Sequence, residues 1–404
     1  MSVATISLWI ALAAVSGTTA ITAGLRGWSA ASRARADRYR DRIADSVVAF
    51  AVGATADPPA APRGRLEHGV MNAELTRLAP HLKGSARDVL ASLFVSYGLL
   101  GSARRDLRSR RSLAVIRAAE LVGTMRAAEC VPILQERLAS ADRLVRVACA
   151  RALAEIGVVS AMAQIADAVS DDGGHESELG EILMNFGGDA AAFLSVRLRE
   201  GRTAAQSRVA AATLGEIHAT SAAPDLVTAL GSPDDELAAR AARALGSIGD
   251  RCAVEPLIVL LGRPRSPSVL AAAASALGTL DDPAGAPALA RALSTDDWAV
   301  RDAAASALVR LGDSGLKAVA ERRGEIRPAG VAHVFGLVDV AGRLEAIIDR
   351  AAAGDAGMDL LVRTACAAGI RSRLDDVARS RSSASSAYAA AVLVLLRAQA
   401  EVAA

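Results

Sequence analysis

The chain has 404 residues, enough for two or three ordinary domains or for one long repeat array. Hydrophobic residues make up 52% of it but aromatic residues only 3%, so a core must come from Ala, Leu and Val in close helix–helix contacts. The formal net charge of +2 provides no global field that would demand a nucleic-acid partner.

The N-terminal segment predicts a membrane anchor. Residues 1–25 carry no charge, and 3–25 as a helix would span about 34 Å, against about 30 Å for a hydrocarbon core. Arginines begin at Arg26, and no basic residue precedes them. The positive-inside rule therefore predicts a single-pass protein of the cytoplasmic membrane, with its N-terminus outside and everything after Arg26 in the cytoplasm.

A cleaved signal peptide is the alternative, because residues 29–31 (Ser-Ala-Ala) resemble a cleavage site. Two features favour the anchor. No basic residue precedes the apolar run, and the run exceeds the usual 7–15 residues of a signal-peptide core.

Residues 26–65 predict a juxtamembrane region, with a basic helix over 33–49 and a Pro-rich linker over 57–64 that acts as a stiff spacer. Residues 66–110 predict an N-terminal helical cap of two or three helices. A basic run spans the end of this cap and the start of the next region. Its six arginines and the single acidic residue Asp106 give a charge of +5 within fourteen residues: Arg104, Arg105, Arg108, Arg110, Arg111 and Arg117.

The position of this basic run near the predicted membrane suggests a docking role. Each basic residue beside an anionic leaflet contributes about 1 kcal/mol, so the run would orient the protein on the bilayer or on an acidic partner. The alternative is an ordinary solvated helix face.

Residues 111–313 contain an internal repeat. The segments 142–157 and 297–312 share an Asp, a Val-Arg pair, an Ala-Leu pair and a closing Gly, and 234–249 fits the same frame. The predicted helix ends recur with a period of about 31 residues and a longer first interval. They are Gly123, Gly157, Gly187, His218, Gly249, Asp281 and Gly312. Prolines at 224, 256 and 287 follow the same period. Each repeat is expected to be a helix pair that buries its faces only by stacking.

Within each pair, Pro opens the first helix, an Asp caps the second, and Gly ends it. Arginines at equivalent positions are expected to bridge neighbouring repeats by pairing with the turn aspartates. A row of donors for an acidic peptide is the alternative. The residues that define the frame are Asp142, Arg146, Gly157, Asp234, Gly249, Asp297, Arg301 and Gly312.

The shared Asp, Val-Arg, Ala-Leu and Gly positions of 142–157 and 297–312 resemble the HEAT repeat family, in the short bacterial form labelled PBS-lyase HEAT-like. The resemblance covers about residues 110–313, is degenerate over 158–205 and fades after 313. It implies an all-α, armadillo-like α-solenoid. Residues 314–404 are expected to form degenerate helical repeats and a C-terminal cap, with helices over 328–339, 343–352, 358–368 and 385–402.

Residues suited to catalysis or metal binding are sparse. No histidine has metal-ligand spacing, and the acidic loop around His175 is expected to be solvated. Neither a phosphate-binding glycine motif nor a nucleophile motif occurs. The cysteines are expected to be small buried hydrophobes in a reducing compartment: Cys130, Cys149, Cys252 and Cys366. We therefore expect no catalytic residue, no cofactor and no metal.

These patterns together predict an all-α solenoid of HEAT-like helix pairs with one N-terminal transmembrane helix. We expect a non-catalytic, membrane-tethered scaffold or adaptor that binds a protein partner, a membrane protein among the candidates, and no nucleic acid. One alternative is an accessory subunit of a membrane enzyme, such as an envelope glycosyltransferase. The other is a PBS-lyase-type enzyme, which rests on the family label alone.

Overall fold

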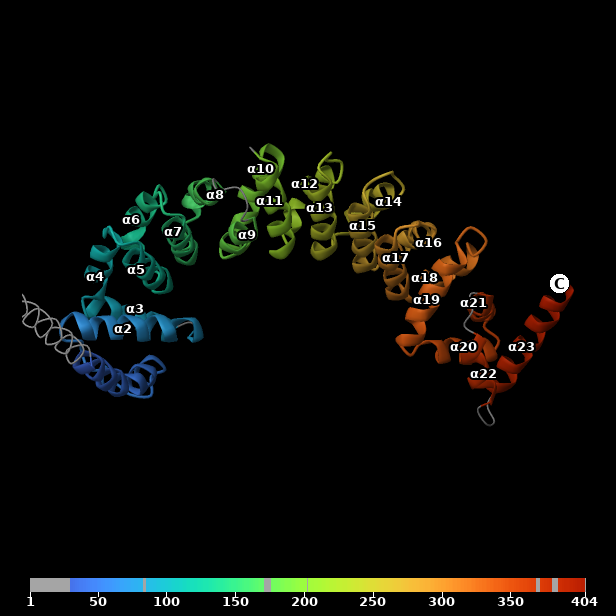
Figure 1. Ribbon diagram of the computed structural model, residues 1–404, viewed down its shortest axis with the longest axis horizontal. Coiled ribbons are helices and arrows are strands. Elements are labelled where there is room, and N and C mark those ends of the chain that lie inside the picture. Colours follow the sequence, from blue (N-terminus) through green and yellow to red (C-terminus); the bar gives the residue numbers. More distant parts are fainter. Residues whose placement is uncertain are drawn as a thin grey trace, which may run out of the picture. The chain divides into compact units, whose positions relative to one another are not determined.

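The computed structural model describes residues 30–82, 85–170, 176–201, 203–367, 371–379 and 384–403, and within these ranges it contains helices and no strand (Figure 1). The all-α prediction is confirmed. The chain divides into two compact units, Met1–Asp172 and Gly173–Ala404. The predicted transmembrane segment, 1–25, lies outside the described residues. Among the residues described, no helix combines the length and apolarity needed to cross a membrane.

The first described element of unit 1 is a helix through residues 30–51. The side chains of Tyr39, Ile43 and Val47 are buried at four-residue spacing, which makes one stripe of this helix a packing face. The remaining elements of unit 1 are α2 (Gly64–Leu78), η1 (Ala79–His81), α3 (Ser85–Ser96), α4 (Leu99–Leu107), α5 (Ser112–Thr124), η2 (Ala128–Cys130), α6 (Val131–Arg137), α7 (Arg143–Ile156), η3 (Val159–Ala161) and α8 (Met162–Ser170).

The Pro-rich stretch 57–64, predicted to be a spacer, is tied into unit 1. The Tyr39 hydroxyl donates a hydrogen bond to the carbonyl of Ala60 (2.8 Å), and the Tyr97 hydroxyl donates to the carbonyl of Pro59. Burial is the main cause that raises the pKa of Tyr39 to about 12. The spacer prediction overlooked these partners, which lie 21 and 38 residues away in the sequence.

Unit 2 consists of two layers of helices. Its second helices contact one another in succession from α9 to α17, and the first helices α10, α12, α14 and α16 lie on the other side (Figure 1). The elements are α9 (Glu176–Met184), η4 (Gly187–Ala190), α10 (Ala191–Glu200), α11 (Ala204–Glu216), η5 (Thr220–Ala222), α12 (Ala223–Ala229), α13 (Asp235–Ile248), η6 (Arg251–Ala253), α14 (Val254–Leu261), α15 (Pro267–Leu280), η7 (Pro283–Gly285), α16 (Ala286–Ala292) and α17 (Trp298–Arg310).

After α17 the helices continue without the short 3₁₀ turns that precede the earlier first helices. They are α18 (Gly312–Glu321), α19 (Pro328–Val340), α20 (Leu344–Ala352), α21 (Ala356–Ala367), α22 (Arg371–Arg379) and α23 (Ala384–Ala403). Four of them overlap the helices predicted from the sequence, whereas α18 and α22 were not predicted. Helix α22 is polar and so lacks the apolar run that would predict a helix.

Left-handed residues mark the repeat more regularly than the sequence suggested. Positive φ angles occur after successive second helices at Arg126, Gly157, Gly187, His218, Gly249, Asp281, Gly312 and Gly342. Every interval between them lies within one residue of the period. The predicted helix end at Gly123 was wrong, because α5 continues to Thr124 and Arg126 takes the left-handed position. Correcting it removes the longer first interval and extends the period one repeat beyond 313.

Gly123 serves instead as a contact between helices. A Cβ atom on it would lie 2.8 Å from the Cα of Ala152 in the next second helix, α7. The same arrangement recurs in unit 2, where a Cβ on Gly215, Gly246 or Gly278 would lie within 3 Å of an alanine one repeat later. Only glycine permits this approach between the backbones of successive second helices.

Three of the four cysteines are buried as expected, but Cys252 is exposed. The prediction placed it inside an apolar helix, whereas it lies in the 3₁₀ turn η6, where its amide donates to the capping Asp250.

Substitution of Gly246 by Ala tests the glycine contact. We expect Gly246→Ala to destabilise unit 2 by about 1–3 kcal/mol, because the added methyl group meets the backbone of Ala276 at 2.9 Å. Gly336→Ala in α19 is the matched control, since nothing lies within 4 Å of its Cβ position and Ala favours a helix by up to about 1 kcal/mol. Urea unfolding of both variants measures the difference, and equal midpoints would contradict the contact.

Substitution of Arg126 tests the left-handed register. At φ 49° a side chain is strained, so Arg126→Gly should stabilise unit 1 by about 1 kcal/mol relative to Arg126→Ala. Both variants remove the guanidinium, so the comparison isolates the backbone effect. Thermal and urea unfolding measure it, and an alanine variant as stable as the glycine variant would show that the position is unstrained.

Candidate interaction surfaces

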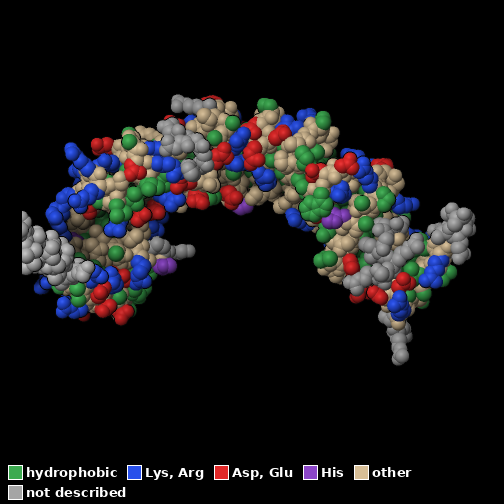
Figure 2. Space-filling view, viewed as in Figure 1, with side chains coloured by type: hydrophobic (Ala, Val, Ile, Leu, Met, Phe, Trp, Pro, Cys, Tyr) green, Lys and Arg blue, Asp and Glu red, His purple; other side chains and the backbone are tan. Residues whose placement is uncertain are grey.

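The six arginines of the basic run lie at one end of unit 1. Arg104 and Arg105 occupy the last turn of α4, and Arg108, Arg110 and Arg111 lie in the turn before α5. Arg117 follows in α5, and all six side chains are exposed. Figure 2 shows Lys and Arg side chains gathered over α4.

Contacts from the next repeat hold this turn in place. The guanidinium of Arg137, in α6, donates to the carbonyls of Leu107 (2.8 Å) and Ser109 (3.2 Å). The Asp142 carboxylate, which caps α7, also accepts a hydrogen bond from the side chain of Ser112, and this bond is the largest cause that lowers the pKa of Asp142. The starts of α5 and α7 are therefore held against each other.

Two exposed leucines lie at these helix starts, and sequence reasoning missed both. Leu113 is 60% exposed in α5 and Leu144 is 61% exposed in α7. They follow the first helical residue in successive repeats and lie 13 positions before the left-handed residues Arg126 and Gly157. The signal in the sequence was their shared position in the frame, where later repeats have Ala205, Glu236, Ser268 or Ala299.

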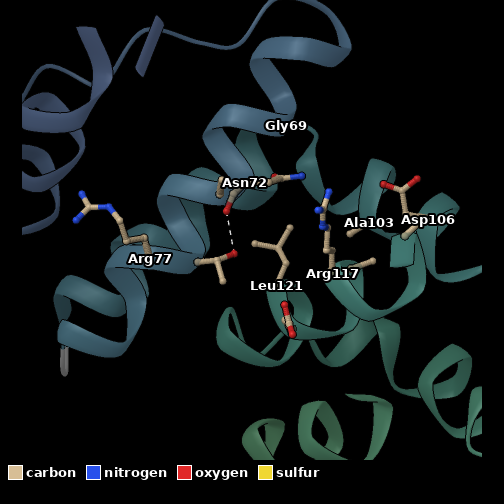
Figure 3. Close-up of a pocket in the computed structure, with 12 residues that line it drawn as sticks. Gly69, Asn72, Arg77, Ala103, Asp106, Arg117 and Leu121 are labelled. Atoms are coloured by element: carbon tan, nitrogen blue, oxygen red, sulfur yellow. Dashed lines mark hydrogen bonds between the residues drawn. The ribbon is translucent and has the colours of Figure 1, made fainter. Parts of the chain in front are cut away.

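A cavity of about 610 Å³ lies between α2, α4 and α5 in the same unit. Its wall combines small apolar residues with Asn72, Asp106 and Arg117 (Figure 3). Figure 3 shows the side chains of Asn72 and Arg117 directed toward one another, while Arg77 points away. Among the described residues, the buried side-chain oxygen of Asn72 has no hydrogen-bond partner.

The frame aspartates act as predicted. Asp142, Asp234 and Asp297 each accept hydrogen bonds from amides of the first turn of α7, α13 and α17. Gly157 and Gly249 are left-handed caps of the same helices α7 and α13. The third frame glycine, Gly312, has a φ of 63° after α17.

The frame arginines bind differently from the prediction. Arg146 donates to the carbonyls of Ser140 and Ala168 (2.9 Å each), and Arg301 donates to the carbonyl of Thr295 (3.0 Å). These hydrogen bonds run to carbonyls rather than to the turn carboxylates, because the turn directs its carbonyls toward the guanidinium six residues later.

Arginine–aspartate pairs between neighbouring repeats do occur, but at other positions. Arg208 in α11 binds the capping Asp234 of α13 through two nitrogens at 2.8 and 3.2 Å, and Arg265 lies 3.0 Å from Asp235. Glu176 adds a link, since its carboxylate lies 2.8 Å from Arg240 and 3.6 Å from Arg208. These ion pairs connect α9, α11 and α13 in one layer.

Only part of the predicted acidic loop lies within the described residues. Asp171, Asp172 and His175 lie outside the described residues, and Glu176 is engaged by arginines. Among the residues that the structure describes, no three His, Cys, Asp or Glu side chains form a group able to hold a metal ion.

An exposed tryptophan marks the second-helix layer of unit 2. Trp298, the first residue of α17, is 63% exposed, and its ring meets His333 of α19 edge to face at 6.5 Å. The Nε2 of His333 lies 2.8 Å from the Asp302 carboxylate, which orients the imidazole. An aromatic ring held in place but open to solvent is suited to binding a partner.

The Arg208–Asp234 pair yields a stability prediction with a defined pH dependence. The hydrogen bond from Arg208 is the largest cause that lowers the pKa of Asp234 below its ordinary 3.8, so the stabilisation is complete above that value and is lost as pH falls through the lowered pKa. We expect Arg208→Ala to lower the free energy of unfolding by about 1 kcal/mol at pH 7 and by progressively less in acid.

Arg243→Ala is the control. The Arg243 side chain is 54% exposed, so its removal should change the free energy of unfolding little. Urea unfolding at pH 7 and pH 3 measures both, and a cost for Arg208→Ala that does not change with pH would contradict the pairing.

Comparison with known proteins supports the repeat. A profile of HEAT repeats matches residues 191–265 and 254–324, which include α10 to α18, so the resemblance is confirmed over 191–313. No curated protein matches significantly. An engineered protein of known crystal structure is similar at 21% identity and TM-score 0.31, covering 86% of this chain and 98% of its own. Human deoxyhypusine hydroxylase in complex with glycerol is similar at 19% identity and TM-score 0.28, covering 70% and 98%. Neither similarity supports a conclusion about activity.

The two profile matches show that residues 191–324 of this chain consist of HEAT repeats.

Proposed function

We propose that this chain is a membrane-tethered scaffold that binds a protein partner through the second-helix layer of unit 2 and does not itself catalyse a reaction. The observation that carries the proposal is Trp298, exposed at the start of α17 and braced by His333. Tryptophans dominate the energy of many interfaces because they bury a large surface with little loss of conformational freedom. The HEAT repeats provide the extended surface on which such a residue is presented.

The tether is the second part of the proposal and rests on the sequence. The uncharged residues 1–25 and the arginines that follow favour an anchor with the repeats in the cytoplasm. A protein held at a membrane in this way has a membrane protein as its natural partner, and an accessory role beside a membrane enzyme is one form of this function.

The test of partner binding compares two single substitutions in the full-length chain. Crosslinking and affinity purification from native membranes should recover a specific partner with the natural chain and lose at least tenfold of it with Trp298→Ala, because an interface tryptophan commonly contributes about 2 kcal/mol or more.

Val259→Ala is the matched control, since Val259 is 43% exposed in α14 of the first-helix layer. Equal recovery with both variants would refute the assigned face, and recovery of background proteins alone would refute the scaffold. Release of the natural chain from membranes by high salt without detergent would refute the tether.

A further inference from the structure

We propose that unit 1 carries a surface that docks on an anionic lipid leaflet. This lipid-docking surface consists of five exposed arginines and two exposed leucines: Arg104, Arg105, Arg108, Arg110, Arg111, Leu113 and Leu144. The inference deepens the proposed membrane attachment, because it identifies a lipid contact separate from the tether and specifies its chemistry.

The structure brings these residues to one edge of unit 1. Arg137 binds the carbonyls of Leu107 and Ser109 and so fastens the basic turn to the repeat that follows it. Helices α5 and α7 pack against each other, and Ser112 at the start of α5 binds Asp142, which caps the start of α7. Leu113 is the neighbour of Ser112 and Leu144 lies two residues after Asp142, so the two leucines lie beside the basic turn.

The charge of this edge favours phosphate groups. Five arginines face a single acidic residue, Asp106, and all of these side chains are exposed. Guanidinium groups bind phosphate through paired N–H donors and do so without a preformed pocket. A leaflet that contains anionic lipid supplies many such phosphates in one plane.

The leucines distinguish a lipid leaflet from an acidic protein. An electrostatic contact with an acidic protein needs only the arginines and leaves two leucines about 60% exposed without explanation. Interfacial membrane-binding elements combine basic residues at headgroup depth with apolar side chains that enter the acyl boundary. Leu113 and Leu144 are the apolar part of that combination.

The connection to the N-terminal segment adds a geometric argument. The helix through residues 30–51 packs into unit 1 through Tyr39, Ile43 and Val47, and Tyr39 and Tyr97 fasten the Pro-rich stretch that follows it. The described helix begins at residue 30, shortly after the uncharged residues 1–25, so a tether there would keep unit 1 within reach of the bilayer.

The experiment places an environment-sensitive fluorophore on full-length protein reconstituted with vesicles. The probe is attached at Leu144→Cys in a background in which the exposed Cys252 is replaced by Ser. The control site is Val159→Cys, because Val159 is 49% exposed and lies beyond the opposite end of α7, about 20 Å from Leu144. The vesicles are phosphatidylcholine alone or phosphatidylcholine with 30% phosphatidylglycerol, that is, about a third anionic lipid.

The expected result is a blue shift of emission at position 144 in the anionic vesicles alone, and no shift at 159. Raising the salt from 0.1 to 1 M should abolish the shift, because the Debye length falls from about 10 Å to about 3 Å. The triple variant Arg105→Glu, Arg108→Glu and Arg111→Glu should abolish it as well. If circular dichroism shows that this variant is unfolded, the corresponding glutamine substitutions take its place.

Other outcomes separate this inference from the tether. Protein that stays in the vesicles without a shift at 144 overturns the docking surface and leaves the tether intact. A salt-sensitive shift in anionic vesicles, together with protein that does not stay bound to neutral vesicles, supports the lipid-docking surface and contradicts the tether. An equal shift in both lipids, or a shift caused by soluble polyglutamate instead of vesicles, overturns the assignment to an anionic leaflet.

Discussion

Close contact between glycine and alanine in successive second helices is the constraint on which the repeat array depends. At Gly123, Gly215, Gly246 and Gly278 the neighbouring alanine backbone leaves no room for a side chain. This contact sets the separation of the helices and explains why a chain with 3% aromatic residues is able to form a core. The core consists of many thin contacts between alanine-rich surfaces, each of which becomes buried only when the next repeat is in place.

The turns between helices are held by arginines rather than by the apolar contacts alone. Arg137, Arg146 and Arg301 donate to turn carbonyls, while Arg208 binds the aspartate that caps the next repeat. A guanidinium has five donors, so one arginine satisfies several of the carbonyls that helix ends leave without partners. Arginines bound in this way stabilise the array, whereas those at the α4–α5 turn are exposed to solvent.

The two proposed contacts use different chemistry on different units. In unit 1, arginines and leucines at one edge suit a charged lipid surface, whereas in unit 2 a braced tryptophan suits a protein interface. A protein that bound a leaflet through one unit and a partner through the other would position that partner at the membrane. The HEAT repeats would then act as the structural link between the two contacts.

The sequence by itself determined the helical class, the repeat period, the capping aspartates and the basic run, because each follows from residue types at short spacing or from their recurrence along the chain. It misplaced one helix end at Gly123, since a glycine and a left-handed arginine only three residues apart cannot be ranked without knowing which of them meets Ala152. Only the tertiary structure decided that Arg146 and Arg301 bind carbonyls, that Tyr39 and Tyr97 fasten the Pro-rich stretch, and that Leu113 and Leu144 stay exposed. Most of these outcomes depend on residues far apart in the sequence, and the packing of one helix pair on the next brings those residues together.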